Sequence, residues 1–156
     1  MSMEIKQASI NHAPVIHNVM IQAFMEYSPP SSALEETIQS ISTALEDGEQ
    51  SFISYMNDEP AGVVRFQMNE HHLYFYRLSV PPEKRGMGVA KGLLQSLEDV
   101  ARQNKKTTML CNVRKNLPKN IQMYHSLGYN IYDEKVVHQP NGLDFEVACM
   151  MKQLTV

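Results

Sequence analysis

Several features that would assign the chain to a membrane or to an oxidising compartment are scarce or absent in the sequence. There is no run of 18 or more apolar residues, which excludes a helix that spans a bilayer. The first six residues, MSMEIK, lack the apolar core of a signal peptide. The only two cysteines, Cys111 and Cys149, lie in apolar surroundings and are expected to be buried thiols rather than a disulfide. We therefore expect a cytoplasmic protein without a membrane partner.

The sequence also lacks an excess of basic residues. Its formal net charge is −3, whereas a surface that binds nucleic acid phosphates normally needs a basic excess. One local basic cluster, Lys84, Arg85 and Lys91, surrounds a pair of glycines. The charge balance therefore predicts that nucleic acid is not a partner.

The histidines and cysteines show no spacing typical of metal ligands. His12 and His17 are five residues apart, and His71 and His72 are adjacent. Neither pair repeats a helical turn in the way a metal-binding pair does. No metal site is expected.

The composition that is present indicates one ordinary globular domain over residues 1–156. Hydrophobic residues make up 43% and charged residues 20% of the chain, which is enough apolar material for one core. Strands are expected near 3–8, 51–56, 61–68, 73–80, 109–113, 129–137 and 145–154, and helices over 11–28, 32–48, from 89 onward and over 117–127. The order β-α-α-β-β-β-α-β-α-β-β predicts an α/β fold with a mixed sheet and helices on both faces.

The most informative segment lies where the third of the consecutive strands ends. There a strand leads through Lys84-Arg85-Gly86-Met87-Gly88 into a helix that starts with Val89-Ala90. The first N–H groups of a helix have no internal partners and carry the positive end of its dipole. Glycines without a Cβ allow phosphate oxygens to approach these amides closely. The turn therefore predicts a site for a diphosphate.

Two common phosphate motifs do not match this turn. A P-loop needs two glycines five residues apart followed by Lys and Ser or Thr, but Lys91 is followed by Gly92. A dinucleotide fingerprint needs a third glycine three residues after Gly88, and that position is Lys91. A nucleotide-binding protein of either kind is disfavoured.

A third pattern, Arg/Gln-x-x-Gly-x-Gly/Ala, matches at Arg85-x-x-Gly88-x-Ala90 and resembles the GNAT superfamily of acetyl-CoA dependent acyltransferases. The preceding Leu78–Glu83 and the later Asn120–Tyr129, with its Leu-Gly-Tyr ending, are also similar to that family, in the same order along the chain. The resemblance implies a central, mostly antiparallel mixed sheet that splays between strands 4 and 5.

The resemblance also implies the cofactor and its site. Acetyl-CoA would be held by Leu78, Ser79, Val80, Lys84, Arg85, Gly86, Met87, Gly88, Val89, Ala90 and Asn120. In many members the corresponding Asn stands seven residues before the tyrosine, where this chain has Leu117 preceded by Asn116, so the choice between Asn116 and Asn120 stays open. Tyr124 resembles the general acid that protonates the leaving thiolate.

The function that the resemblance implies is N-acetyl transfer from acetyl-CoA to a primary amine by direct attack, in an enzyme expected to form a homodimer. The alternative is an acyl-CoA-binding regulatory module without turnover, because the strand at 73–80 has no Asp or Glu to serve as a base. Glu26 and Tyr27 are candidates for lining the acceptor site, or are simply exposed at a helix end. The acceptor, a small molecule or a peptide amine, is not specified.

Overall fold

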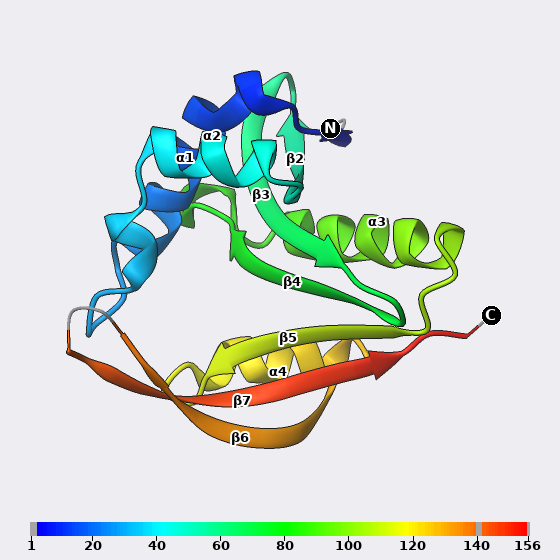
Figure 1. Cartoon of the computed structure of the whole chain (residues 1–156). Helices are drawn as coiled ribbons and strands as arrows, with labels where there is room; N and C mark the ends of the chain where they lie inside the picture. Colours follow the sequence, from blue (N-terminus) through cyan, green and yellow to red (C-terminus); the bar gives the residue numbers. More distant parts are fainter. Residues whose placement is uncertain (1–2, 140–141, 156) are drawn as a thin grey trace. The chain divides into compact units, whose positions relative to one another are not determined.

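A computed structural model of the chain describes residues 3–139 and 142–155. Its seven strands form one mixed sheet in the order β1-β2-β3-β4-β5-β7-β6 (Figure 1). The strands are β1 Met3–Gln7, β2 Gln50–Met56, β3 Glu59–Met68, β4 His72–Ser79, β5 Thr108–Arg114, β6 Asn130–His138 and β7 Asp144–Gln153. The α-helices are α1 Ala13–Phe24, α2 Ile38–Glu46, α3 Val89–Gln103 and α4 Pro118–Ser126, and the short 3-10 helices are η1 Ile10–His12, η2 Ser32–Glu35 and η3 Pro82–Lys84. The predicted α/β fold class and element order are confirmed.

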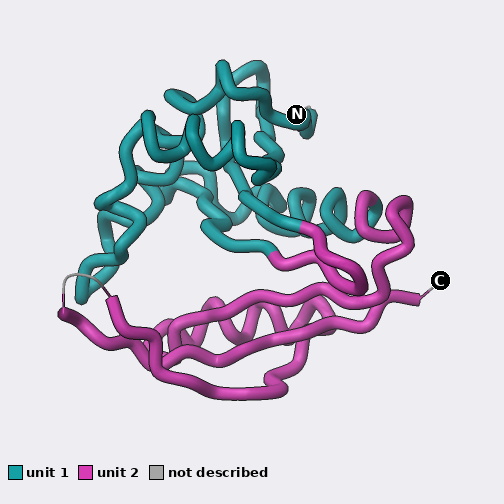
Figure 2. Tube along the Cα trace, in the orientation of Figure 1, with its two compact units in different colours: residues 1–67, 75–99 teal, residues 68–74, 100–156 magenta. Residues whose placement is uncertain are grey.

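The chain divides into two compact units (Figure 2). Unit 1 comprises residues 1–67 and 75–99, and unit 2 comprises residues 68–74 and 100–156. The expectation of a single domain over 1–156 stays a prediction. None of the helices among the described residues is long and apolar enough to cross a membrane.

In unit 1, helices cover both faces of the sheet. On one face α1 and α2 pack against β2 and β3 through Ile16, Met20, Ile41, Ile53 and Val63, all of which are fully buried. Ile53 and Val63 are direct partners in the β2–β3 ladder and therefore point to the same face. These buried side chains form the hydrophobic core on this face of unit 1.

On the other face of unit 1, two glycines allow α3 to approach the strands closely. A Cβ built on Gly62 would lie 2.6 Å from Val89 Cγ1, and one built on Gly92 would lie 2.7 Å from Met3 Cε. Side chains at these positions would push α3 away from β3 and β1. The start of α3 is thereby fixed against the sheet.

The end of the first helix and the start of the second differ from the sequence prediction. The first helix ends at Phe24 rather than continuing to the Pro29-Pro30 pair. The second was expected to start at Ser32, but Ser32–Glu35 is a separate 3-10 turn, and α2 starts after Thr37, whose side chain accepts a hydrogen bond from Ser40 N. Capping signals occur twice in close succession here, and the hydrophobic pattern alone does not separate the two short helices.

Unit 2 contains the antiparallel strands β5, β7 and β6 together with the first residues of β4. β4 runs parallel to β5 over only three pairs, His72–Thr108, Leu73–Met109 and Tyr74–Leu110. Such a short ladder is what a sheet that splays between strands 4 and 5 requires. The connection between the last two strands, expected near 129–137 and 145–154, includes residues 140–141, which lie outside the described residues.

The two cysteines are free and buried, as predicted. Cys111 lies opposite Met150, and Cys149 lies opposite Asn112 in the β5–β7 ladder. Neighbouring positions along a strand point to opposite faces, so the two thiols cannot be bridged without backbone movement. Burial, with a smaller contribution from Cys149, raises the pKa of the Cys111 thiol to about 12, and this thiol is therefore a poor nucleophile near neutral pH.

Candidate active site

The glycine turn has the backbone geometry of an anion-binding cradle. Gly86 and Gly88 have φ values of +78° and +83°, a region that side-chain-bearing residues seldom adopt. Gly88 C=O accepts the N–H of Gly92 at 2.9 Å, so the first amides of α3 follow directly and lack partners inside the helix. A Cβ built on either glycine would meet nothing within 4 Å. The space beside these amides is thus accessible to a diphosphate.

The guanidinium of Arg85, expected to add charge at this turn, has three partners within unit 1. Its Nε donates to Val80 O at 3.0 Å, its Nη2 donates to Ala23 O at 3.4 Å, and its Nη1 lies 2.5 Å from Glu26 Oε1. The structure therefore brings Glu26, a candidate acceptor residue, to the glycine turn. Because this carboxylate offsets the guanidinium charge, the helix amides carry more of the attraction for a phosphate than the sequence suggested.

Two other predicted residues of unit 1 also have protein partners. Lys84 Nζ lies 3.1 Å from Glu59 Oε2. Tyr27 is half-buried and packs edge-on against Phe24, with ring centroids 5.1 Å apart. Glu26 itself is exposed, so the two candidate acceptor residues differ in their surroundings.

The end of β4 has an irregular backbone next to the residues expected to bind the cofactor's arm. Arg77 has a φ of +53°, an uncommon conformation for a residue with a long side chain. The buried Ser79 hydroxyl donates to Arg77 O at 2.9 Å and so stabilises this conformation. Leu78 and Val80 on either side of Ser79 are half-buried. Unusual backbone of this kind is often found at functional sites.

In unit 2, α4 carries the two predicted residues of the second motif. Tyr124 is 8% exposed and packs edge-on against Tyr129, with ring centroids 5.7 Å apart. Asn120 is half-buried and lies one turn before Tyr124, on the same face of the helix. Asn116 is exposed and precedes α4. Burial and helix position therefore distinguish Asn120 from Asn116, the two residues between which the sequence left the choice open.

Unit 1 also contains a network of charged residues that the sequence did not reveal. Arg65 is 4% exposed; its Nε donates to Glu49 Oε2 at 2.8 Å, and its Nη1 lies 2.8 and 2.9 Å from the two carboxylate oxygens of Glu36. Arg77 Nε donates to Glu36 Oε2 at 3.0 Å, and Tyr76 OH donates to Glu49 Oε1. Acidic and basic groups thus alternate from the start of β2 across β3 to β4.

Burial and neighbouring groups shift the pKa values of two members of this network, Arg65 and Tyr76. Burial alone would lower the pKa of Arg65, but hydrogen bonds and charges from Glu49 and Glu36 outweigh it and raise that pKa. Burial and the bond to Glu49 raise the pKa of Tyr76 well above its ordinary value. Arg65 is therefore a permanent cation and Tyr76 a permanent donor at neutral pH.

The network brings carboxylates to β4, a strand without Asp or Glu of its own. Glu36 follows η2 and Glu49 directly precedes β2, so no local motif could have linked them to β4. The one sequence signal was Arg65 within the otherwise apolar run 61–66 of β3, since a buried arginine requires acidic partners. Among the described residues there is no group of three or more His, Cys, Asp or Glu placed to hold a metal ion.

Comparison with known proteins identifies the family. The model of the acetyltransferase (GNAT) family matches residues 16–129, more than half of the chain. A search of curated protein sequences found no significant match.

Solved structures share the fold at low sequence identity. A proposed acetyltransferase, yncA of Salmonella typhimurium, solved with its cofactor acetyl-CoA, has a TM-score of 0.81 at 20% identity, covering 100% of this chain and 96% of its own. The ribosomal-protein-S18-alanine N-acetyltransferase of Escherichia coli has a TM-score of 0.82 at 16% identity over 99% and 96% of the two chains. The paia N-acetyltransferase of Thermoplasma acidophilum, in complex with coenzyme A, has a TM-score of 0.77 at 17% identity over 99% and 100%.

The glycine turn that leads into α3 lies within the matched residues. The chain belongs to the GNAT family of acetyltransferases and is an acyltransferase that uses acetyl-CoA.

Proposed function

We propose that this protein transfers the acetyl group of acetyl-CoA to a primary amine by direct attack. The observation that carries the proposal is the glycine turn at the start of α3, whose two positive-φ glycines leave the helix amides accessible. Direct transfer, without an acyl-enzyme, is favoured because burial raises the pKa of both cysteine thiols and leaves little nucleophilic thiolate near neutral pH.

The residues of unit 1 would bind and polarise the acyl donor. Acetyl-CoA supplies a thioester whose carbonyl carbon is susceptible to a neutral amine. The amides that follow Gly88 would hold the diphosphate. Backbone N–H groups near Leu78 and Val80, next to the unusual backbone of Arg77, would bind the pantetheine arm and donate to the thioester carbonyl as negative charge develops on it.

In unit 2, Tyr124 would be the general acid and Asn120 would bind the cofactor's arm. A proton from the Tyr124 hydroxyl would neutralise the departing thiolate, and the proton lost by the amine would pass to solvent. The carboxylates near β4 do not serve well as the base, because Glu36 and Glu49 already accept hydrogen bonds from arginines in ion pairs.

The proposal is tested by following thiol release from acetyl-CoA with a panel of amines. We expect release that depends on the amine, together with an acetylated product identified by mass spectrometry. Acetyl-CoA binding without release for any amine would instead favour a binding module.

Replacing Gly88 with valine is expected to weaken acetyl-CoA binding by at least about tenfold while the fold persists, because a branched side chain would occupy the space beside the amides. Calorimetry measures the affinity. Gly48→Val is the matched control, since Gly48 also has a positive φ of +109° and nothing within 4 Å of an added Cβ, yet it lies at the end of α2. Equal affinities for the wild type and Gly88→Val would show that the turn does not bind the diphosphate.

A homodimer is proposed as the working form in solution. β6 is an edge strand of the sheet, and Ile131, Tyr132 and Val136 on it are about half exposed, an arrangement that favours pairing with another chain. Light scattering is expected to give twice 17.8 kDa for the wild type and a monomer for Val136→Lys. A monomeric wild type at high concentration would end this proposal.

Buried free thiols also support a reducing, cytoplasmic location.

A further inference from the structure

The charged network of unit 1 ends at Arg77, whose guanidinium donates only some of its N–H groups to protein acceptors. Arg77 donates through Nε to Glu36 Oε2 at 3.0 Å and through Nη2 to Ser32 Oγ at 3.2 Å. A guanidinium has five N–H donors. Within the residues that the structure describes, the remaining three, both on Nη1 and one on Nη2, have no protein acceptor. The end-on edge of the guanidinium fork is made by one N–H of each Nη nitrogen.

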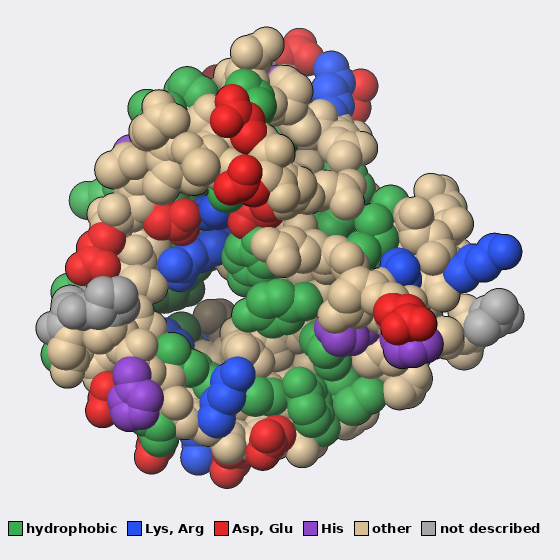
Figure 3. Space-filling model, viewed as in Figure 1, with side chains coloured by type: hydrophobic (Ala, Val, Ile, Leu, Met, Phe, Trp, Pro, Cys, Tyr) green, Lys and Arg blue, Asp and Glu red, His purple; other side chains and the backbone are tan. Residues whose placement is uncertain are grey.

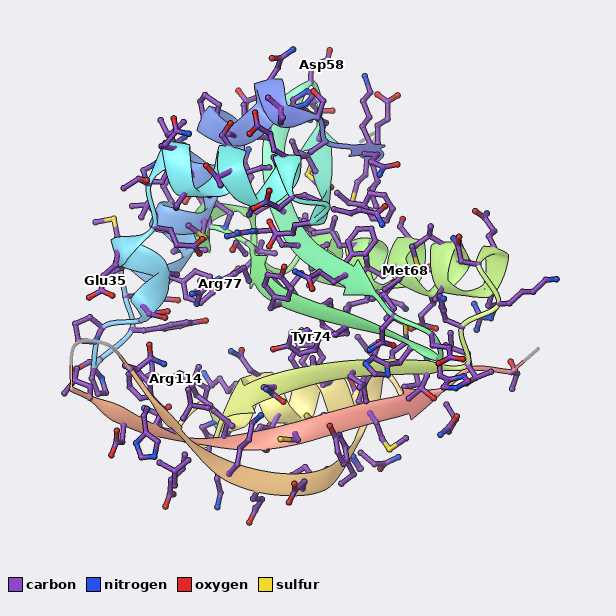
Figure 4. All side chains as sticks on the ribbon, viewed as in Figure 1. Glu35, Asp58, Met68, Tyr74, Arg77 and Arg114 are labelled. Carbon is purple, nitrogen blue, oxygen red and sulfur yellow. The ribbon has the colours of Figure 1, made fainter. Side chains whose placement is uncertain are left out.

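This edge is accessible to a ligand. The Arg77 side chain is 26% exposed, compared with 4% for Arg65. Figure 4 shows Arg77 on the same side of unit 1 as Glu35, the residue directly before Glu36. Basic and acidic side chains lie side by side on this face of unit 1 (Figure 3). Of the two arginines in the network, Arg77 is thus the more accessible to a ligand.

The guanidinium is also held in one orientation. Glu36 is itself fixed by Arg65 through two contacts of 2.8 and 2.9 Å, so the carboxylate that orients Arg77 cannot rotate freely. An arginine that is held along one edge loses little side-chain entropy when its other edge binds a ligand. Two parallel N–H groups on a planar fork match the two oxygens of a carboxylate.

The position of Arg77 relates this edge to acetyl transfer. Arg77 directly precedes Leu78 on β4, where the proposed function places the thioester carbonyl, and its partners Ser32 and Glu36 belong to the segment between α1 and α2. A group bound to Arg77 would therefore lie a few residues from the reacting carbonyl.

We propose that the end-on edge of Arg77 binds a carboxylate on the amine acceptor, so that the acceptor is a small amino acid rather than a simple amine. This inference rests on the proposed acetyl transfer. Arg77 is then a specificity-determining residue, and Glu36 and Ser32 are positioning residues that hold its guanidinium.

The test compares amino acids with their decarboxylated counterparts, which carry no carboxylate: lysine with cadaverine, histidine with histamine and phenylalanine with phenethylamine. The readout is kcat/KM from thiol release. We expect the wild type to prefer the carboxylate-bearing member of at least one pair. Arg77→Lys keeps a charge next to Glu36 but lacks the fork, and we expect it to reduce that preference by about 10- to 100-fold, the effect of one charge-assisted bidentate contact.

Two controls separate recognition from a purely structural role. Arg102→Gln removes one positive charge from α3 and is expected to keep the wild-type preference. In Arg77→Lys the activity toward the decarboxylated amine should persist, which shows that the fold and the transfer chemistry remain. Equal losses toward both members of a pair, or a wild type without preference, would overturn the inference and leave acetyl transfer standing. Absence of transfer to every member would contradict the proposed function as well.

Discussion

Replacing Arg65 with leucine is expected to lower the free energy of unfolding by about 3–5 kcal/mol, the usual cost of removing one partner from a buried ion pair. Arg65 and Glu49 are both 4% exposed at the side chain and lie 2.8 Å apart. Leucine fills part of the volume but leaves the Glu49 carboxylate buried without its cation. Urea denaturation at neutral pH measures the change.

Two further variants show whether the unpaired charge causes this loss. Adding Glu49→Gln to Arg65→Leu removes the uncompensated charge and should recover part of the stability, since residues in one network are not additive. Lys6→Gln removes a cation from an exposed pair, in which Lys6 and Glu4 lie 3.9 Å apart, and should change stability by less than about 1 kcal/mol. A loss of similar size for Arg65→Leu and Lys6→Gln would show that the buried network does not stabilise unit 1.

Tyr124→Phe is expected to lower kcat by roughly 100-fold, the low end of general acid–base catalysis, with little change in acetyl-CoA affinity. A thiol has an ordinary pKa near ~8.5 and a tyrosine hydroxyl near ~10, so proton transfer becomes useful only as the C–S bond breaks. Phenylalanine keeps the edge-on contact with Tyr129 but has no proton to donate. Single-turnover kinetics at saturating acetyl-CoA measure the effect on the chemical step.

Tyr129→Phe is the matched control for this substitution. Tyr129 is fully buried and is the ring partner of Tyr124, so the control removes a hydroxyl from the same ring pair. We expect its kcat to stay within about threefold of the wild type, because its hydroxyl has no role in the proposed transfer. Thermal melts of both variants establish that they are folded. Unchanged turnover in a folded Tyr124→Phe would exclude the acid role.

Local patterns in the sequence were sufficient for most of the fold. Strand alternation placed β2 to β5 within two residues, and the apolar face of the long helix placed the start of α3 at Val89, because both patterns are set by backbone periodicity. The region from Pro29 to Thr37 was predicted less well. It contains two capping motifs within six residues, and the choice between one helix and two depends on packing.

The glycine turn could likewise be identified from sequence, since its requirements are local: glycines with positive φ, followed at once by a helix start. The partners of its side chains could not. Arg85 was assigned to the phosphates, but its guanidinium contacts Glu26, 59 positions earlier in the chain. Such pairings depend on how α1 packs beside the end of β4.

The sequence by itself determined the family motif, the order of the elements and the candidate residues of the glycine turn and α4. Each of these depends on neighbours along the chain, and backbone geometry relates such neighbours directly. Only the tertiary structure decided that Glu49, Arg65, Glu36 and Arg77 form one network. These four residues come from β3, β4 and two connecting segments, and the burial that makes their charges interact strongly exists only after the sheet and helices have packed together.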